Sequence, residues 1–135
     1  MSDAINFNNE EMFVSLNKPD YSLFKNTRYA LQGLYEVFKN EQSFRMQLLF
    51  FLFASVIAWI LPFSYVQRSI LFISLFLPVI TEIINSAIER SVDLITQEHH
   101  ELAKRAKDAG AAIVFVSFVT VAFVWFLVIF YSYMS

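Results

Sequence analysis

The sequence predicts an all-α membrane protein in which one amphipathic surface helix precedes three transmembrane helices. Of the 135 residues, 57% are hydrophobic and only 16% are charged, whereas soluble proteins average about 45–50% apolar and about 25% charged residues. The apolar residues gather in three long runs, and the segment before them alternates apolar and polar residues at helical spacing. A single small domain cannot bury so much apolar surface in a water-soluble core, so a lipid bilayer is the expected solvent.

The remaining composition excludes several classes of function. A net charge of −2 gives no overall attraction to nucleic acids, so no nucleic-acid partner is expected. Cysteine is absent, which excludes disulfides, thiolate metal ligands and cysteine nucleophiles. Residues 1–20 are polar and acidic and lack the apolar stretch of a cleavable signal peptide. We expect them to form a loose N-terminal tail, followed by a single membrane domain over residues 21–135.

Residues 21–40 predict the surface helix. Its apolar stripe consists of Leu23, Thr27, Ala30, Leu31, Leu34 and Phe38. Most charged side chains of the segment lie off this stripe, so the helix is too polar to span a bilayer but basic enough to lie on an anionic surface. A helix that packs on the soluble side of the protein would show the same pattern, and the two arrangements are compatible.

The apolar runs predict transmembrane helices over residues 44–61, 66–90 and 111–133. In the first span, the nearly all-apolar run covers only residues 46–61, which is somewhat short because a span needs roughly 20 residues. Phe44 and a helical lead-in extend it. Pro78 lies inside the second span and predicts a kink there, which membrane helices tolerate. Aromatic residues at the span ends, such as Trp59 and Tyr131, are typical of a membrane interface.

The basic residues predict the orientation. Nine of the ten lie before the first span or between the second and third: Lys18, Lys25, Arg28, Lys39, Arg45, Arg90, Lys104, Arg105 and Lys107. Only Arg68 lies near the other side. Because cytoplasmic loops carry the excess of Lys and Arg, we expect a multi-pass protein of the inner membrane with a cytoplasmic N-terminus and a cytoplasmic loop over residues 89–110.

The second span carries an unusual polar stripe. Glu82, Asn85, Glu89 and Asp93 are spaced i, i+3, i+7 and i+11, which places them on one helix face. Glu82 lies about two turns, on the order of 10 Å, deeper than Glu89. An ionisable group at that depth costs about 2.5 kcal/mol or more, and such residues usually face a bundle interior and mark function. A helix that merely emerges into water would explain Glu89 and Asp93 but not Glu82.

Two further groups of charged residues lie beside the membrane. Lys104, Arg105 and Lys107 suit a polyphosphate, although ordinary cytoplasmic anchors would look the same. Glu41 lies at the cytoplasmic edge of the first span, near the depth of Glu89. Two carboxylates at one level suit Mg²⁺, which usually keeps waters and substrate phosphates as its other ligands, whereas a lone interfacial glutamate is more often only solvated.

Glycine-rich nucleotide loops are absent, since the chain has only two glycines. Any phosphoryl transfer must therefore rely on side-chain charge and Mg²⁺. The chemistry permits this, because positioning and charge neutralisation carry most of the catalysis.

Several of these segments resemble a known family. They are EIINSAIE at residues 82–89, then Asp93, HELAKRAKD at 100–108, NExxFR at 40–45 and YxxxGL at 29–34. In order and spacing they resemble the bacterial diacylglycerol kinases, which are small membrane enzymes with three spans. The resemblance covers roughly residues 25–125.

The resemblance implies a domain-swapped homotrimer with an active site shared between subunits near the cytoplasmic interface. It implies transfer of the γ-phosphate of ATP to the primary hydroxyl of diacylglycerol, which gives phosphatidic acid. By the same resemblance, Glu82 is the general base and Glu41 and Glu89 bind Mg²⁺. The implied nucleotide and supporting contacts are Tyr29, Asn85, Glu98, His100, Lys107 and Asp108.

The sequence departs from the family pattern at three positions. Ser22, Gln47 and Ala111 stand where an arginine, an acidic residue and a small hydroxyl residue are expected. A branch of the family phosphorylates undecaprenol, but the residues before the RAKD motif look more like the diacylglycerol branch.

A small transporter or channel subunit is the rival from another class, with Glu82 as its coupling carboxylate. A transporter has no need of Glu41, Glu89 and the Lys107-Asp108 pair together. A structural anchor without catalysis would leave the buried Glu82 unexplained.

Overall fold

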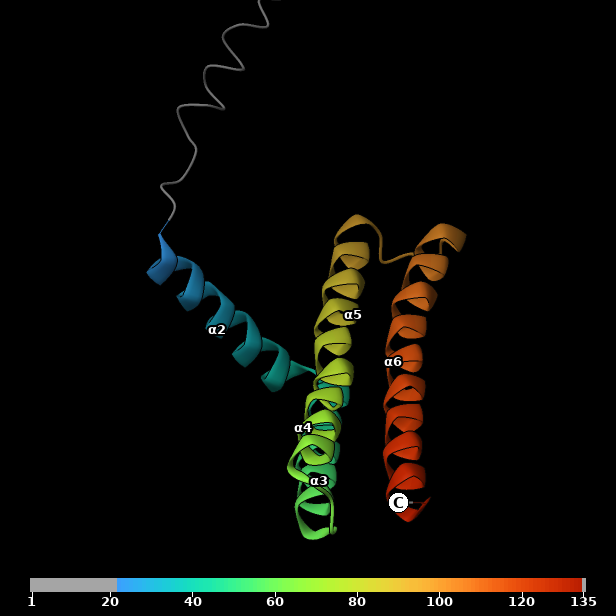
Figure 1. The fold of residues 1–135 in the computed structure, drawn as a ribbon. Helices are drawn as coiled ribbons and strands as arrows, with labels where there is room; N and C mark the ends of the chain where they lie inside the picture. The colour runs from blue at the N-terminus through green and yellow to red at the C-terminus, as the bar shows by residue number, and fades with distance from the viewer. Residues whose placement is uncertain (1–21, 135) are drawn as a thin grey trace, which may run out of the picture. The chain divides into compact units, whose positions relative to one another are not determined.

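The computed structural model describes residues 22–134, and every regular element within that range is an α-helix. The helices are α2 (Leu23–Asn40), α3 (Gln42–Ile60), α4 (Tyr65–Ser74), α5 (Phe76–Ile95) and α6 (Glu101–Met134) (Figure 1). The expected tail over residues 1–20 lies outside the described residues. Contacts divide the chain between Gln32 and Gly33 into two compact units.

The described part of the first unit is the N-terminal portion of α2. Ser22 precedes the helix, and its hydroxyl accepts a hydrogen bond from the backbone N–H of Lys25 at 3.5 Å. Serine is a favoured residue at this position because its side chain satisfies a free N–H of the first turn. All side chains from Leu23 to Gln32 are exposed within the unit.

Three helical segments of the second unit are long and apolar enough to cross a membrane: α3, α4 with α5 as one segment of 31 residues, and the 34-residue α6. Each overlaps one of the spans expected from the sequence, although α3 ends one residue before the expected end at 61, so the all-helical fold class with three candidate spans is confirmed. The loop expected over residues 89–110 is shorter in the structure, because α5 continues to Ile95 and α6 begins at Glu101. Residues 101–109 are rich in strong helix formers such as alanine, lysine and glutamate, which form helix without an apolar run.

The second span is interrupted close to Pro78. Helix α4 ends at Ser74, and the N–H of Leu75 bonds the carbonyl of Phe72 at 3.2 Å, three residues back. In a continuous helix the carbonyl of Ser74 would receive the N–H of residue 78, which proline lacks, and the proline ring would collide with that carbonyl. The break therefore follows from Pro78 and agrees with the kink expected there.

Small side chains occupy the helix contacts of the second unit. Ala54 and Ala58 of α3, Ser86 of α5, and Gly110 and Ser117 of α6 are buried. Helices α5 and α6 lie side by side along much of their length and share the most extensive contact (Figure 1). Small residues let membrane helices approach closely, where packing and interhelical hydrogen bonds replace the hydrophobic drive.

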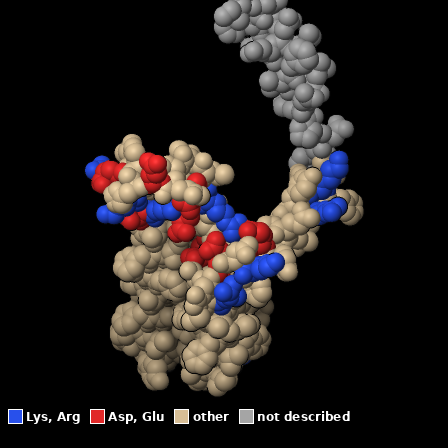
Figure 2. Space-filling view, turned by 180° about the vertical axis from the view of Figure 1, so that it is seen from behind, with Lys and Arg blue, Asp and Glu red and all other residues tan. Residues whose placement is uncertain are grey.

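Many large apolar side chains point outward instead. Phe53 and Phe115, for example, are 68% and 69% exposed. This arrangement would be unfavourable in water, but it is expected where lipid is the solvent. Figure 2 shows the charged side chains of the visible face gathered towards the end where α5 ends and α6 begins, and a lower part without charge.

Candidate active site

The polar stripe of α5 faces the interior of the second unit at its deeper positions. The exposed fractions of Glu82, Asn85 and Ser86 are only 5%, 8% and 3%. Glu89 is half-buried, and Asp93 is exposed beyond it. The helical spacing in the sequence therefore predicted correctly which face is buried.

Glu82 is held by a residue of α3. The amide Nε2 of Gln47 donates a hydrogen bond to Glu82 Oε2 at 2.7 Å, and both side chains are buried. A buried carboxylate without a hydrogen bond would be strongly unfavourable, so this contact matters for keeping the group inside the bundle. Gln47 is one of the departures from the family pattern. An acid in its place would bring two carboxylates together, which cannot both ionise at that distance.

Asn85 bonds Glu89 one turn further along α5 and lies against a glycine of α6. Its Nδ2 donates to Glu89 Oε1 at 2.9 Å. A Cβ added at Gly110 would collide with Asn85 Oδ1 and lie 3.6 Å from Ile88 Cδ1. Gly110 thus leaves the space in which the Asn85 amide lies. Reasoning from the sequence missed this role, although a glycine inside a helix is unfavourable and so hints at a packing requirement.

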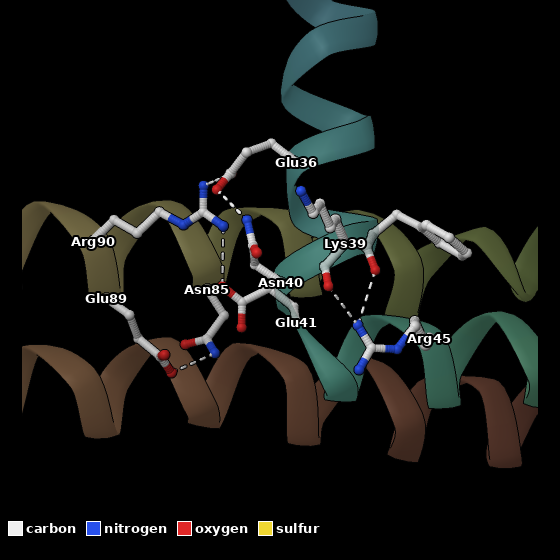
Figure 3. Close-up of polar contacts among 9 residues, drawn as sticks. Glu36, Lys39, Asn40, Glu41, Arg45, Asn85, Glu89 and Arg90 are labelled. Atoms are coloured by element: carbon white, nitrogen blue, oxygen red, sulfur yellow. Dashed lines mark hydrogen bonds and ion pairs between the residues drawn. The ribbon is translucent and has the colours of Figure 1, made fainter.

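Glu41 lies at the joint between α2 and α3, where it is the N-cap residue of α3. Arg90 of α5 donates from Nη2 to Glu41 Oε1 at 3.1 Å and from Nη1 to Glu36 (Figure 3). The hydrogen bond from Arg90, followed by one from Asn40, lowers the pKa of Glu36 below its usual value. Reasoning from the sequence used Arg90 only as one of the basic residues that predict the orientation, and it did not single out Glu36.

Three carboxylates from two parts of the chain meet in this region. Glu82 and Glu89 lie on one face of α5, and Arg90, the residue after Glu89, bonds Glu41. The structure therefore brings the expected base and both expected metal ligands into one region.

A pocket of about 270 Å³ opens between the end of α5 and the start of α6. Its lining includes four expected nucleotide contacts: Glu98, His100, Lys107 and Asp108. Lys107 Nζ lies 2.6 Å from Asp93 Oδ1, so this ammonium already has a carboxylate partner. Lys104 also lines the pocket. Tyr29, the remaining expected contact, is an exposed residue of the first unit.

His100 has a structural role as well. It directly precedes α6, and its Nδ1 accepts a hydrogen bond from the backbone N–H of Leu102 at 3.2 Å. The carbonyl of His100 accepts from the N–H of Lys104 at 3.0 Å. His100 therefore caps α6 at the rim of the pocket.

The carboxylates of the candidate site fit a Mg²⁺ site that is completed by other ligands. Among the described residues, no group of three or more His, Cys, Asp or Glu side chains is arranged to hold a metal ion. Mg²⁺ is usually bound by only one or two carboxylates together with waters and substrate phosphates. Glu41 and Glu89 fit that pattern, in which the nucleotide supplies the missing ligands.

The chain is similar in sequence to known proteins over most of its length. Residues 28–129 match the family model described as prokaryotic diacylglycerol kinase. The diacylglycerol kinase of Haemophilus influenzae is 37% identical over 109 residues, which cover 81% of this chain and 92% of that protein. That of Escherichia coli strain K12 is 40% identical over 103 residues, covering 76% and 84%. That of Helicobacter pylori strain J99 is 36% identical over 103 residues, covering 76% and 80%.

Proposed function

Because the chain belongs to the prokaryotic diacylglycerol kinase family, we propose that it transfers the γ-phosphate of ATP to diacylglycerol and so forms phosphatidic acid. One observation carries this proposal beyond family membership. The buried Glu82 lies on the same face of α5 as Glu89, whose neighbour Arg90 bonds Glu41, and the polar pocket lined by Lys107 lies between α5 and α6.

Glu82 acts as the general base. The hydroxyl oxygen of diacylglycerol attacks the γ-phosphorus, the bond from that phosphorus to the bridging oxygen of ADP breaks, and the hydroxyl proton passes to the Glu82 carboxylate. Burial suits this role, because a lipid hydroxyl arrives from the bilayer side. The hydrogen bond from Gln47 fixes Oε2 and leaves Oε1 for the substrate.

Glu41 and Glu89 hold Mg²⁺ in this proposal, with Asn85 orienting Glu89 through Oε1. The ion would neutralise charge on the phosphates that the nucleotide carries. Lys107, Asp108, Glu98, His100 and Tyr29 contact the nucleotide. When the nucleotide binds, Lys107 leaves Asp93 and pairs with a phosphate instead. This change is feasible because the exposed ion pair between Lys107 and Asp93 contributes at most about 1 kcal/mol.

The finer architecture is also part of the proposal. Residues 21–135 form one membrane kinase domain that assembles as a domain-swapped homotrimer, and residues 21–40 lie amphipathically on the surface and help admit lipid. The N-terminus and the active site face the cytoplasm in the inner membrane. The basic residues around α5 and α6 and the outward-facing apolar side chains of the spans support this arrangement.

The test is a transfer assay with purified protein in mixed micelles, labelled ATP and Mg²⁺, with diacylglycerol and undecaprenol offered side by side. We expect labelled phosphatidic acid, and none from Glu82→Gln. Labelled undecaprenyl phosphate alone would assign the chain to the other branch of the family. No labelled lipid from a folded protein would contradict a kinase and favour a transporter.

A further inference from the structure

Arg90 links three elements of the second unit through one guanidinium group. It extends from α5 and bonds Glu36, in the last part of α2, through Nη1. Through Nη2 it bonds Glu41, the N-cap residue of α3. Figure 3 shows Arg90 reaching both glutamates, with Asn85 and Glu89 beside them. We call Glu36, Arg90 and Glu41 the joint triad.

The backbone of the joint is fixed without Arg90. Arg45 of α3 donates from Nη1 to the carbonyls of Phe38 and Lys39 at 3.0 and 2.9 Å, which satisfies carbonyls at the end of α2. The N–H of Glu41 bonds the carbonyl of Val37 at 2.8 Å. The effect of Arg90 is therefore on the direction of the Glu41 side chain rather than on the path of the chain.

The contact with Glu41 leaves room for a second ligand. Arg90 engages Oε1, so Oε2 remains for a cation. Carboxylates that bind metals are commonly held by such outer hydrogen bonds, whose loss typically weakens metal binding about 10- to 100-fold.

The positive charge of Arg90 would by itself repel a cation, and Glu36 counteracts that repulsion. The triad contains two carboxylates and one guanidinium, so its net charge is −2 + 1 = −1. Glu36 thus balances Arg90, and the charge of Glu41 stays available to a metal ion.

We infer that Arg90, balanced by Glu36, is a positioning residue that orients Glu41 towards a divalent cation shared with Glu89. This inference rests on the proposed function, because it takes Glu41 and Glu89 as the metal ligands.

The test measures binding of Mn²⁺ to the full chain in detergent by electron paramagnetic resonance, with a non-hydrolysable ATP analogue present. Arg90→Ala should raise the Kd for Mn²⁺ about tenfold. Glu36→Gln should also raise it, since the charge of Arg90 is then uncompensated. The double variant should bind no more weakly than Arg90→Ala, because Glu36 acts only through Arg90. Melting temperatures should change little.

Arg68→Ala is the matched control. Arg68 donates from Nη2 to the carbonyl of Leu61 at 3.3 Å and contacts no expected metal ligand or nucleotide contact. Its removal should leave the Kd for Mn²⁺ unchanged. If Arg90→Ala fails to fold, Arg90→Lys tests the same point, because an ammonium keeps the charge but lacks the fork that holds two carboxylates.

The outcomes separate the inference from the proposed function. If Glu41→Gln and Glu89→Gln lose Mn²⁺ while Arg90→Ala binds it as the native chain does, the metal ligands stand and the inference is overturned. Tighter binding by Arg90→Ala also overturns it, since Arg90 would then compete with the ion. If Glu41→Gln itself binds Mn²⁺ normally, the metal assignment fails, and the inference fails with it.

Discussion

Replacing Gly110 with alanine tests how the packing of α6 supports the candidate site. The new Cβ would collide with Asn85 Oδ1 and touch Ile88. Asn85 can move only by giving up its 2.9 Å bond to Glu89. Glu89 would then lose the hydrogen bond that orients its carboxylate, so we expect the dependence of transfer on Mg²⁺ to change.

The expected effect on stability combines opposing contributions. Overpacking a buried contact destabilises by about 1–3 kcal/mol, and the lost bond to a charged carboxylate is worth about 1.5–3 kcal/mol. Alanine in place of glycine inside a helix contributes about 1 kcal/mol in the other direction. Gly110→Ala should therefore be less stable by a few kcal/mol and should need more Mg²⁺ for half-maximal transfer.

Gly33→Ala provides the matched control. Nothing lies within 4 Å of a Cβ added at Gly33, which is also inside a helix. That variant should gain stability by about 0.5–1 kcal/mol with an unchanged Mg²⁺ requirement. Melting in detergent and Mg²⁺ titration of transfer check both variants. Equal stabilisation of the two with native Mg²⁺ dependence would refute the argument that Gly110 makes room for Asn85.

Three further predictions probe the site. Glu82→Gln should abolish transfer through turnover rather than apparent affinity while nucleotide binding and melting stay close to native; substantial activity that tracks thermal stability would make Glu82 structural. Gln47→Leu should lower the melting temperature, because it removes the hydrogen bond to the buried Glu82 and leaves that acceptor unsatisfied at about 1–3 kcal/mol; unchanged melting would contradict this. Lys107→Ala should raise the KM for ATP far more than Lys104→Ala, and equal small effects would return both lysines to the role of membrane anchors.

The spans and the polar stripe follow from local physics. Apolar runs of membrane length predict helices, and Pro78 predicts a kink, because both depend on residues near in sequence. The i, i+3, i+7 spacing likewise places Glu82, Asn85 and Glu89 on one face at any helix packing. Residue chemistry suggested Mg²⁺ for Glu41 and polyphosphate for Lys107, but an isolated interfacial charge has many explanations, and only the resemblance to a family favoured these roles.

The contacts between helices depended on the tertiary structure. Gln47 and Glu82 are 35 positions apart, and Arg90 lies 49 positions from Glu41. Their meeting depends on which helices are neighbours and on how each is rotated and shifted along its partner, which no local period encodes. The same holds for Gly110, whose importance becomes visible only when Asn85 of the neighbouring helix occupies the space that a Cβ would fill.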